Sequence, residues 1–264
     1  MAAVATLLII AGSDSGGGAG IQADLKTASA LGVYGATAIT AITAQNTMGV
    51  RAVAPLAPDM VAAQIRAVLD DIRVDAVKIG MLATADIVAA TAGALQDYAG
   101  PVVLDPVMVA KSGDALLDAP AVSALREELL PRATMLTPNL PEAARLLGRE
   151  ATDPAETRGA ALRALGPETV LVKGGHADGP ICRDVLVTGA GALAFEAPRL
   201  TTRNTHGTGC SLASAIAAEM AKGADPEAAV GRAHGWLHAA IRAADRLGVG
   251  HGHGPVHHFH EVWA

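Results

Sequence analysis

Short aliphatic runs alternate with segments of helical spacing along most of the chain. The aliphatic runs predict buried strands at residues 7–11, 36–42, 76–79, 102–104, 135–136 and 169–172. Between them, good helix formers predict helices at residues 59–70, 85–98, 122–130, 142–147 and 155–165. Strands that alternate with helices form right-handed βαβ units. We therefore expect an α/β fold with a mostly parallel central sheet and helices on both faces.

The pattern changes in the last third of the chain. Two further strands are predicted at residues 185–188 and 192–197, and two helices at residues 211–222 and 226–247. The strands flank a Gly-Ala-Gly turn, which is typical of a hairpin. Gly223 suits the end of the first helix and Pro226 the start of the second. Because no low-complexity linker and no internal repeat interrupts the sequence, we expect residues 1–264 to form a single domain.

Glycines and polar residues gather just after the predicted strands. These groups occupy residues 12–20, 45–49, 80–81, 105–114, 137–142 and 173–176. In an open α/β sheet, ligands bind outside the carboxyl ends of the strands. One such group alone is ordinary turn chemistry, but their repetition indicates an active site at that edge of the sheet.

Composition and charge narrow the class of protein. The 264 residues are 51% hydrophobic but hold only two each of Trp, Tyr and Phe, so the core must be aliphatic. The formal net charge is -6 and no basic block occurs, which argues against an extended nucleic-acid surface. The N-terminal apolar run has no basic region before it and predicts a first strand, not a signal peptide. The longest uncharged stretch is broken by polar residues, so we expect no membrane span and a cytoplasmic enzyme.

A glycine-rich segment, AGSDSGGGAGIQADLK, covers residues 11–26. Its glycines permit close backbone approach and positive φ. It matches neither the GxGxxG dinucleotide fingerprint nor the GxxxxGK phosphate loop followed by Ser or Thr. One interpretation is a flexible turn from strand to helix. The three consecutive glycines favour a loop that folds over a small substrate, with Gly12, Gly20 and Asp24 as candidate contacts.

A second small-residue segment, THGTGCSLASAIAA, precedes an Ala-rich helix at residues 205–218. The backbone N–H groups of Gly207, Thr208, Gly209 and Cys210 would point outward at the helix N-terminus. Such an end carries about half a positive charge and binds anions. An ordinary helix cap is the alternative. The tight spacing of small residues favours a site that stabilises a phosphoryl group during transfer.

The two cysteines and the C-terminal histidines are interpreted from their positions. At a helix N-terminus, we expect the pKa of the Cys210 thiol to be depressed. Cys182 is interpreted as a small buried apolar residue, and the two do not make a disulfide framework. Five histidines lie near the C-terminus, at His251, His253, His257, His258 and His260. Without an H-E-x-x-H pattern or a partner cysteine, they indicate a packed or partly exposed terminal segment.

Asn139 and Glu142 admit two interpretations. Their spacing of three residues lets one helix face present both, and Mg²⁺ accepts oxygen ligands of this kind. The same spacing forms a capping box, in which Asn139 caps the helix and Glu142 reaches back. The spacing does not decide between them.

Charged residues also follow two of the predicted strands. Asp105 ends a buried strand, so its carboxylate would enter the cleft, with Lys111 and Asp114 in the polar loop beyond it. Lys173 leaves another buried strand and is able to neutralise phosphate oxygens. The alternatives are Asp-Pro turn chemistry at Asp105 and a lysine extended to the surface at Lys173.

Taken together, these motifs resemble the hydroxymethylpyrimidine/phosphomethylpyrimidine kinases. The matching segments are AGSDSGGGAGIQADLK at 11–26, AQNTMGV at 44–50, KIGML at 78–82, DPVMVAKSGD at 105–114, TPNLPEA at 137–143, VKGGH at 172–176, THGTGC at 205–210 and GPVHHF at 254–259. The resemblance spans residues 7–260. It implies the ribokinase-like fold, ATP and Mg²⁺ as cofactors, and two successive phosphorylations that lead to the pyrimidine diphosphate for thiamine. It also implies a homodimer, which is common among such relatives.

The resemblance further implies roles for individual residues. Gln45 would hydrogen-bond the aminopyrimidine and Met81 would line its pocket. Asn139 and Glu142 would form an Asn-x-x-Glu magnesium motif. Asp105 and Lys173 would act near metal and phosphates, with Thr208 among the phosphate contacts. Residues 207–210 would form the anion hole.

One position departs from the wider superfamily. Many sugar kinases end the anion-hole loop with a general-base Asp, where this chain has Cys210. A vitamin B6 kinase branch also carries Cys there, so a pyridoxine/pyridoxal kinase is the alternative enzyme. Gln45 and Met81 favour the pyrimidine, because an amide offers both a donor and an acceptor. A non-catalytic pyrimidine sensor is the alternative of another class, but a sensor would need neither phosphate nor metal residues.

Overall fold

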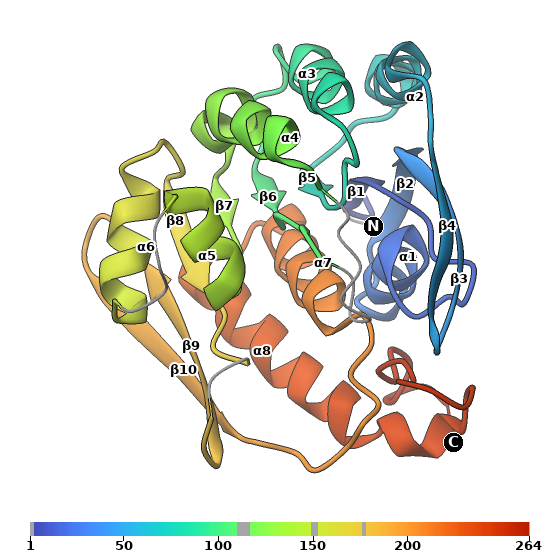
Figure 1. The fold of residues 1–264 in the computed structure, drawn as a ribbon, viewed down its shortest axis with the longest axis vertical. Helices are drawn as coiled ribbons and strands as arrows, with labels where there is room; N and C mark the ends of the chain where they lie inside the picture. The colour runs from blue at the N-terminus through green and yellow to red at the C-terminus, as the bar shows by residue number, and fades with distance from the viewer. Residues whose placement is uncertain (1–2, 110–116, 149–152, 176–177, 264) are drawn as a thin grey trace.

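One central sheet organises the chain (Figure 1). The computed structural model describes residues 3–109, 117–148, 153–175 and 178–263. Within these residues the strand order is β10-β9-β8-β7-β6-β5-β1-β2. The strands are β1 (Thr6–Ala11), β2 (Tyr34–Ile39), β5 (Ala76–Ile79), β6 (Val102–Leu104), β7 (Met135–Leu136), β8 (Thr169–Val172), β9 (Ile181–Val187) and β10 (Ala192–Pro198). Neighbours from β8 to β2 run parallel, whereas β9 and β10 add an antiparallel hairpin. The mostly parallel sheet and the hairpin are as predicted.

Two helical layers cover the sheet. One layer holds α1 (Gly20–Ala30), α7 (Thr208–Ala221) and α8 (Pro226–Arg242). The other holds α2 (Pro58–Asp71), α3 (Ala85–Ala94), α4 (Ala119–Ala124), α5 (Leu140–Leu147) and α6 (Ala155–Arg163). Side chains alternate along a strand, so Leu7 and Ile9 of β1 face the first layer while Leu8 and Ile10 face the second. Helices on both faces were expected from the strand–helix alternation.

The predicted strand at 36–42 is divided in the structure. β2 ends at Ile39, and the chain then enters β3 (Ala41–Asn46), which pairs with β4 (Gly49–Pro55) as a separate antiparallel hairpin. Thr40 marks the break. Its N–H donates to Ala11 O and its hydroxyl donates to Met81 O at 2.6 Å. These bonds turn the chain out of the central sheet, and Gln45 consequently lies within β3 rather than after a sheet strand.

Two predicted helices are interrupted. The segment predicted at 122–130 begins within α4, continues as a π-helical turn at Leu125–Leu129 and ends in a 3₁₀ turn at Leu130–Arg132. The last predicted helix stops at Arg242, before a 3₁₀ turn at Ala244–Leu247. Among the described residues, no helix is both long and apolar enough to cross a membrane.

Candidate active site

The carboxyl ends of β6, β7 and β8 bring charged residues together. Asp105 follows β6, and Lys173 follows β8. Lys173 Nζ lies 2.7 Å from Asp105 Oδ1, and the hydroxyl of Thr137, after β7, donates to the same oxygen at 3.2 Å. We call Asp105, Thr137, Glu142 and Lys173 the strand-end cluster. The cluster confirms that the predicted strand-end residues meet at one edge of the sheet.

The N-terminus of α5 supplies Glu142 to this cluster. Asn139 accepts from the Glu142 N–H at 2.8 Å, while Glu142 Oε2 accepts from the Asn139 N–H at 2.8 Å. The capping-box interpretation is therefore correct as local structure. The same carboxyl also faces the strand-end charges: burial, reinforced by Asp105, raises its pKa to about 7, although Lys173 opposes this shift.

The charge of Lys173 is set by its neighbours. Burial disfavours the ammonium form, but the carboxylates of Asp105 and Glu142 outweigh it and raise the pKa of Lys173. The side chain is therefore a cation at physiological pH, and it is not the surface-extended lysine of the alternative interpretation.

The donor set of the strand-end cluster fits Mg²⁺ in one way. Within the described ranges, no group of three or more His, Cys, Asp or Glu side chains is arranged to hold a metal. Mg²⁺, however, is commonly held by one or two carboxylates together with water and substrate phosphates. Asp105 and Glu142 supply two such carboxylates, whereas the Asn139 amide oxygen is engaged in the helix cap.

The N-terminus of α7 lies against the strand-end cluster. Gly207 is its N-cap with φ 78°, a conformation that favours glycine, and a side chain there would overlap the carbonyl of Gly18. A Cβ on Gly209 would lie 3.3 Å from Lys173 Nζ and 3.7 Å from Asp105 Oδ2. The Thr208 hydroxyl donates to Thr205 O at 2.7 Å. The first turn of this helix is thus beside the Lys173–Asp105 ion pair of the strand-end cluster.

The expected depression of the Cys210 pKa is wrong. Burial raises the pKa of its thiol to about 11, helped by the carboxylates of Asp24 and Asp105 and opposed by Lys78. Its place in the first turn of α7 is as predicted. The helix-terminus argument failed because it did not count desolvation, which favours the neutral thiol.

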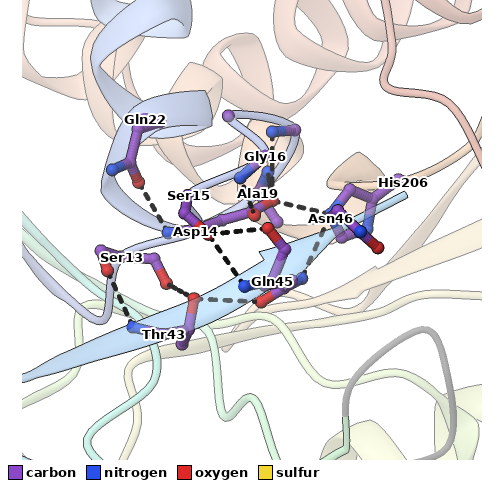
Figure 2. Close-up of polar contacts among 12 residues, drawn as sticks. Ser13, Asp14, Ser15, Gly16, Ala19, Gln22, Thr43, Gln45, Asn46 and His206 are labelled. Carbon is purple, nitrogen blue, oxygen red and sulfur yellow. Dashed lines mark hydrogen bonds and ion pairs between the residues drawn. The ribbon is translucent and has the colours of Figure 1, made fainter. Parts of the chain in front are cut away.

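A second group of polar residues joins the glycine-rich segment to β3 (Figure 2). Gln45 Nε2 lies 3.3 Å from His206 Nε2, which in turn lies 2.8 Å from Asp14 Oδ2. The Thr43 hydroxyl is 3.4 Å from Gln45 Oε1. Thr43 and Gln45 share one face of β3, and we call Asp14, Thr43, Gln45 and His206 the loop cluster. These residues carry mainly hydrogen-bonding groups, unlike the strand-end cluster.

Met81 and Gly12 lie together beside the loop cluster. Met81, just after β5, is nearly buried, and a side chain on Gly12 would overlap its methyl group. Gly20 begins α1 with φ 55°, and a side chain there would overlap the carbonyl of Gly12. The backbone overlap and the positive φ explain why glycine is required at Gly20, whereas a side chain at Gly12 would displace the flexible end of Met81.

Asp24 lies beneath the site rather than on its surface. Its exposed fraction is 0%, with Oδ2 2.8 Å from Lys78 Nζ and Oδ1 accepting from the Ser214 hydroxyl at 2.7 Å. The structure therefore does not bring Asp24 to the loop cluster. Although burial disfavours a charged amine, the Asp24 carboxylate raises the pKa of Lys78 and keeps this buried cation charged.

Sequence reasoning missed the roles of Asp14 and His206. Both lie within segments that were singled out, AGSDSG and THGTGC, but neither was proposed as a site residue. The sequence signal for these two residues was a carboxylate and a histidine, each within a glycine-rich motif. Their pairing across 192 positions is set by the fold.

The remaining predicted residues divide into two groups. Lys111, Asp114 and His176 lie outside the described residues. In the C-terminal segment, His257 and His258 are buried while His251 and His253 are exposed. His258 Nε2 lies 2.9 Å from the Ser211 hydroxyl of α7. The packed and partly exposed segment agrees with the prediction.

Known proteins match this chain over nearly its full length. A family model described as phosphomethylpyrimidine kinase matches residues 14–257. The hydroxymethylpyrimidine/phosphomethylpyrimidine kinase of Rhizobium meliloti (strain 1021) is 56% identical, over 98% of this chain and 98% of its own.

Solved structures agree with the fold. A phosphomethylpyrimidine kinase from Clostridium difficile 630 has 42% identity and a TM-score of 0.79, covering 90% of this chain and 100% of its own. The pyridoxal kinase of Staphylococcus aureus in complex with ADP has 34% identity and a TM-score of 0.90, covering 99% and 96%. The ribokinase-like expectation is confirmed, and the chain belongs to the phosphomethylpyrimidine kinase family.

Proposed function

We propose that the chain transfers the γ-phosphoryl group of ATP to the hydroxymethyl oxygen of 4-amino-5-hydroxymethyl-2-methylpyrimidine. A second transfer, to the monophosphate, then gives the diphosphate on the route to thiamine. Membership of the family supports this chemistry. The observation that carries the proposal is the meeting of Lys173, Asp105 and the N-terminus of α7 at one sheet edge.

The strand-end cluster would act on the phosphates. The Lys173 ammonium and the N–H groups of Gly209 and Cys210 offer positive charge to phosphate oxygens, which is the main requirement of phosphoryl transfer. Asp105 and Glu142 would hold Mg²⁺, with Asn139 orienting Glu142 through the helix cap. When bound, the metal neutralises charge on the phosphates.

The loop cluster would recognise the pyrimidine. The Gln45 amide supplies a donor and an acceptor, matching the amino group and ring nitrogen of an aminopyrimidine. Met81 and the bare backbone of Gly12 supply an apolar wall beside it. The uncharged amide of Gln45 and hydroxyl of Thr43 suit a neutral heterocycle.

The substrate hydroxyl must lose its proton when its oxygen bonds to phosphorus and the bond to ADP breaks. The raised pKa of Cys210 leaves the thiol protonated near neutral pH, so it is a poor base. Phosphoryl transfer has a loose transition state, in which the hydroxyl need not be deprotonated early. We infer that Cys210 contributes chiefly through its backbone N–H.

A pyridoxine/pyridoxal kinase remains the second candidate, because the Staphylococcus aureus pyridoxal kinase shares this fold. The Gln45 amide favours the aminopyrimidine over it. A cytoplasmic homodimer stays a prediction.

Product analysis tests the proposal. The purified chain, with ATP and Mg²⁺, should convert hydroxymethylpyrimidine first to the monophosphate and then to the diphosphate, followed by ³¹P NMR and mass spectrometry. The monophosphate supplied alone should also give the diphosphate. Turnover of pyridoxal or a sugar with none of the pyrimidine would refute the proposal.

A further inference from the structure

Asp14 and His206 form a nearly buried pair between two loops (Figure 2). Their side chains are 1% and 9% exposed, and His206 Nε2 lies 2.8 Å from Asp14 Oδ2. Although burial opposes it, the hydrogen bond and charge of His206, with backbone N–H groups, lower the pKa of Asp14. Asp14 is therefore a carboxylate, which only accepts, so the proton between the two groups lies on His206 Nε2.

The same carboxylate gathers the glycine-rich loop. Asp14 Oδ1 accepts from the N–H of Gly16 at 2.8 Å, and Oδ2 accepts from those of Gly18 and Ala19 at 3.1 and 2.8 Å. A Cβ on Gly18 would lie 2.5 Å from His206 Cδ2, so a side chain there would push the histidine away. The loop is shaped to let His206 reach Asp14.

The amide of Gln45 lies between two groups that already donate elsewhere. His206 Nε2–H donates to Asp14, and the Thr43 hydroxyl donates to Ser13 O at 2.9 Å. With Gln45 Nε2 placed 3.3 Å from His206 Nε2, two donors face each other. A half-turn of the amide removes the conflict, because Gln45 Oε1 then shares the His206 Nε2–H with Asp14, and the Gln45 NH₂ faces a Thr43 lone pair. Amide orientation follows from such networks.

We propose that Asp14 and His206 are positioning residues that fix the amide orientation of Gln45 and thereby set selectivity for an aminopyrimidine. The inference rests on the proposed function. In the fixed orientation, one N–H and one carbonyl lone pair of the amide stay free for a ligand. An amide turned the other way would place its NH₂ against the amino group of the ligand and its oxygen against the ring nitrogen, and would mismatch the aminopyrimidine edge. Neither positioning residue needs to touch the reacting atoms.

A double-mutant cycle tests the proposal in the full-length enzyme. His206→Leu removes the donor, whereas His206→Gln keeps an N–H that reaches Asp14. We expect His206→Leu to raise the KM for hydroxymethylpyrimidine about tenfold, with the KM for ATP changed less than about twofold. His206→Gln should stay within about threefold of wild type. In the Gln45→Leu background, His206→Leu should add less than about twofold, because coupled residues are not additive.

The exposed His253 supplies a matched control, since its ring contacts Arg203 O rather than Gln45. His253→Leu should leave both KM values unchanged. Two results would overturn the proposal. One is a His206→Leu increase in the KM for the pyrimidine that is as large in the Gln45→Leu background as in wild type. The other is an equal increase in the KM values for ATP and the pyrimidine.

A measurement that does not depend on activity completes the test. ¹⁵N NMR of histidine-labelled wild type, assigned with His206→Gln, should show His206 protonated at Nε2. An unprotonated Nε2 would overturn the proposal. Wild-type enzyme that fails to phosphorylate the pyrimidine would refute the proposed function instead, while the tautomer would still test the pairing.

Discussion

The loop cluster and the strand-end cluster lie at the same edge of the fold but use different physics. The strand-end cluster concentrates charge, with the Lys173–Asp105 pair at 2.7 Å and Glu142 beside it. The loop cluster presents an amide and hydroxyl whose orientation depends on a chain of hydrogen bonds. The difference indicates that one end stabilises transferred charge, while the other selects the acceptor. Variants in the two clusters should therefore change different kinetic constants.

Removing the strand-end cation should have the largest effect. Lys173→Met takes away positive charge where phosphate charge is handled, and we expect kcat to fall about 100- to 1,000-fold. The KM for the pyrimidine should change little. Lys222→Met, which removes a surface lysine paired with Glu219, is the matched control and should keep wild-type kcat. Steady-state kinetics measure both variants. A Lys173→Met variant with a raised KM and an unchanged kcat would contradict the assignment of charge stabilisation to the strand-end cluster.

Replacing the Gln45 amide should have an intermediate effect, confined to binding of the pyrimidine. Gln45→Leu leaves the polar edge of the pyrimidine unpaired, at a cost of about 1–3 kcal/mol. The KM for the pyrimidine should rise about tenfold or more while the KM for ATP is nearly constant. An equal rise in the KM values for both substrates would count against a direct contact between Gln45 and the pyrimidine.

Neutralising Glu142 should change the metal requirement and the pH dependence of stability. Glu142→Gln keeps an acceptor for the helix cap but removes the charge, so we expect a several-fold higher Mg²⁺ requirement. If Glu142 were only a cap, the Mg²⁺ requirement would be unchanged, and a loss of about 1 kcal/mol in stability would be the main effect.

The sign of the pH effect follows from the raised pKa of Glu142. Its folded state retains a proton between the ordinary value of 4.5 and about 7, so this group makes folding less favourable as the pH rises through that window. The stability of Glu142→Gln relative to wild type should therefore increase from pH 5 to pH 8 in urea titrations without metal. A constant difference would show that the carboxyl is not perturbed.

Removing the Cys210 thiol should have the smallest effect. Cys210→Ala keeps the backbone N–H, and a thiol of pKa about 11 is neutral near pH 7 in wild type. We expect kcat to fall less than about tenfold, a smaller loss than removing a donor from such a hole. Cys210→Asp should be no better, because it adds negative charge beside Asp105. A folded, ATP-binding but inactive Ala variant would make the thiolate the base.

The strand-end cluster was predictable because parallel strands bring successive strand ends to one edge. Asp105 and Lys173 each follow a short aliphatic run, so their meeting required only the βαβ pattern. The loop cluster was less accessible. Gln45 is identified through a family motif, but the predicted strand at 36–42 joins β2 to the first residues of β3, since nothing at Thr40 breaks the apolar run, and no strand is predicted for β4.

The features of the site that the sequence did not predict depend on contacts between distant residues and on burial. The partners of Asp24 and Asp14 are Lys78 and His206, distant in sequence, and no spacing rule identifies them. The pKa prediction for Cys210 failed for a related reason. Its position at a helix end is visible in the sequence, but the desolvation that controls its pKa depends on how α7 packs.

Comparing kcat/KM for two acceptors tests most directly whether the two clusters have separate roles. We predict that wild-type kcat/KM is higher for hydroxymethylpyrimidine than for pyridoxal, and that Gln45→Leu reduces this ratio about tenfold. Lys173→Met should lower kcat for both acceptors by the same factor and leave the ratio unchanged. A ratio that responds to Lys173 and not to Gln45, or a wild type that prefers pyridoxal, would contradict the assignment of selection to the loop cluster and transfer to the strand-end cluster.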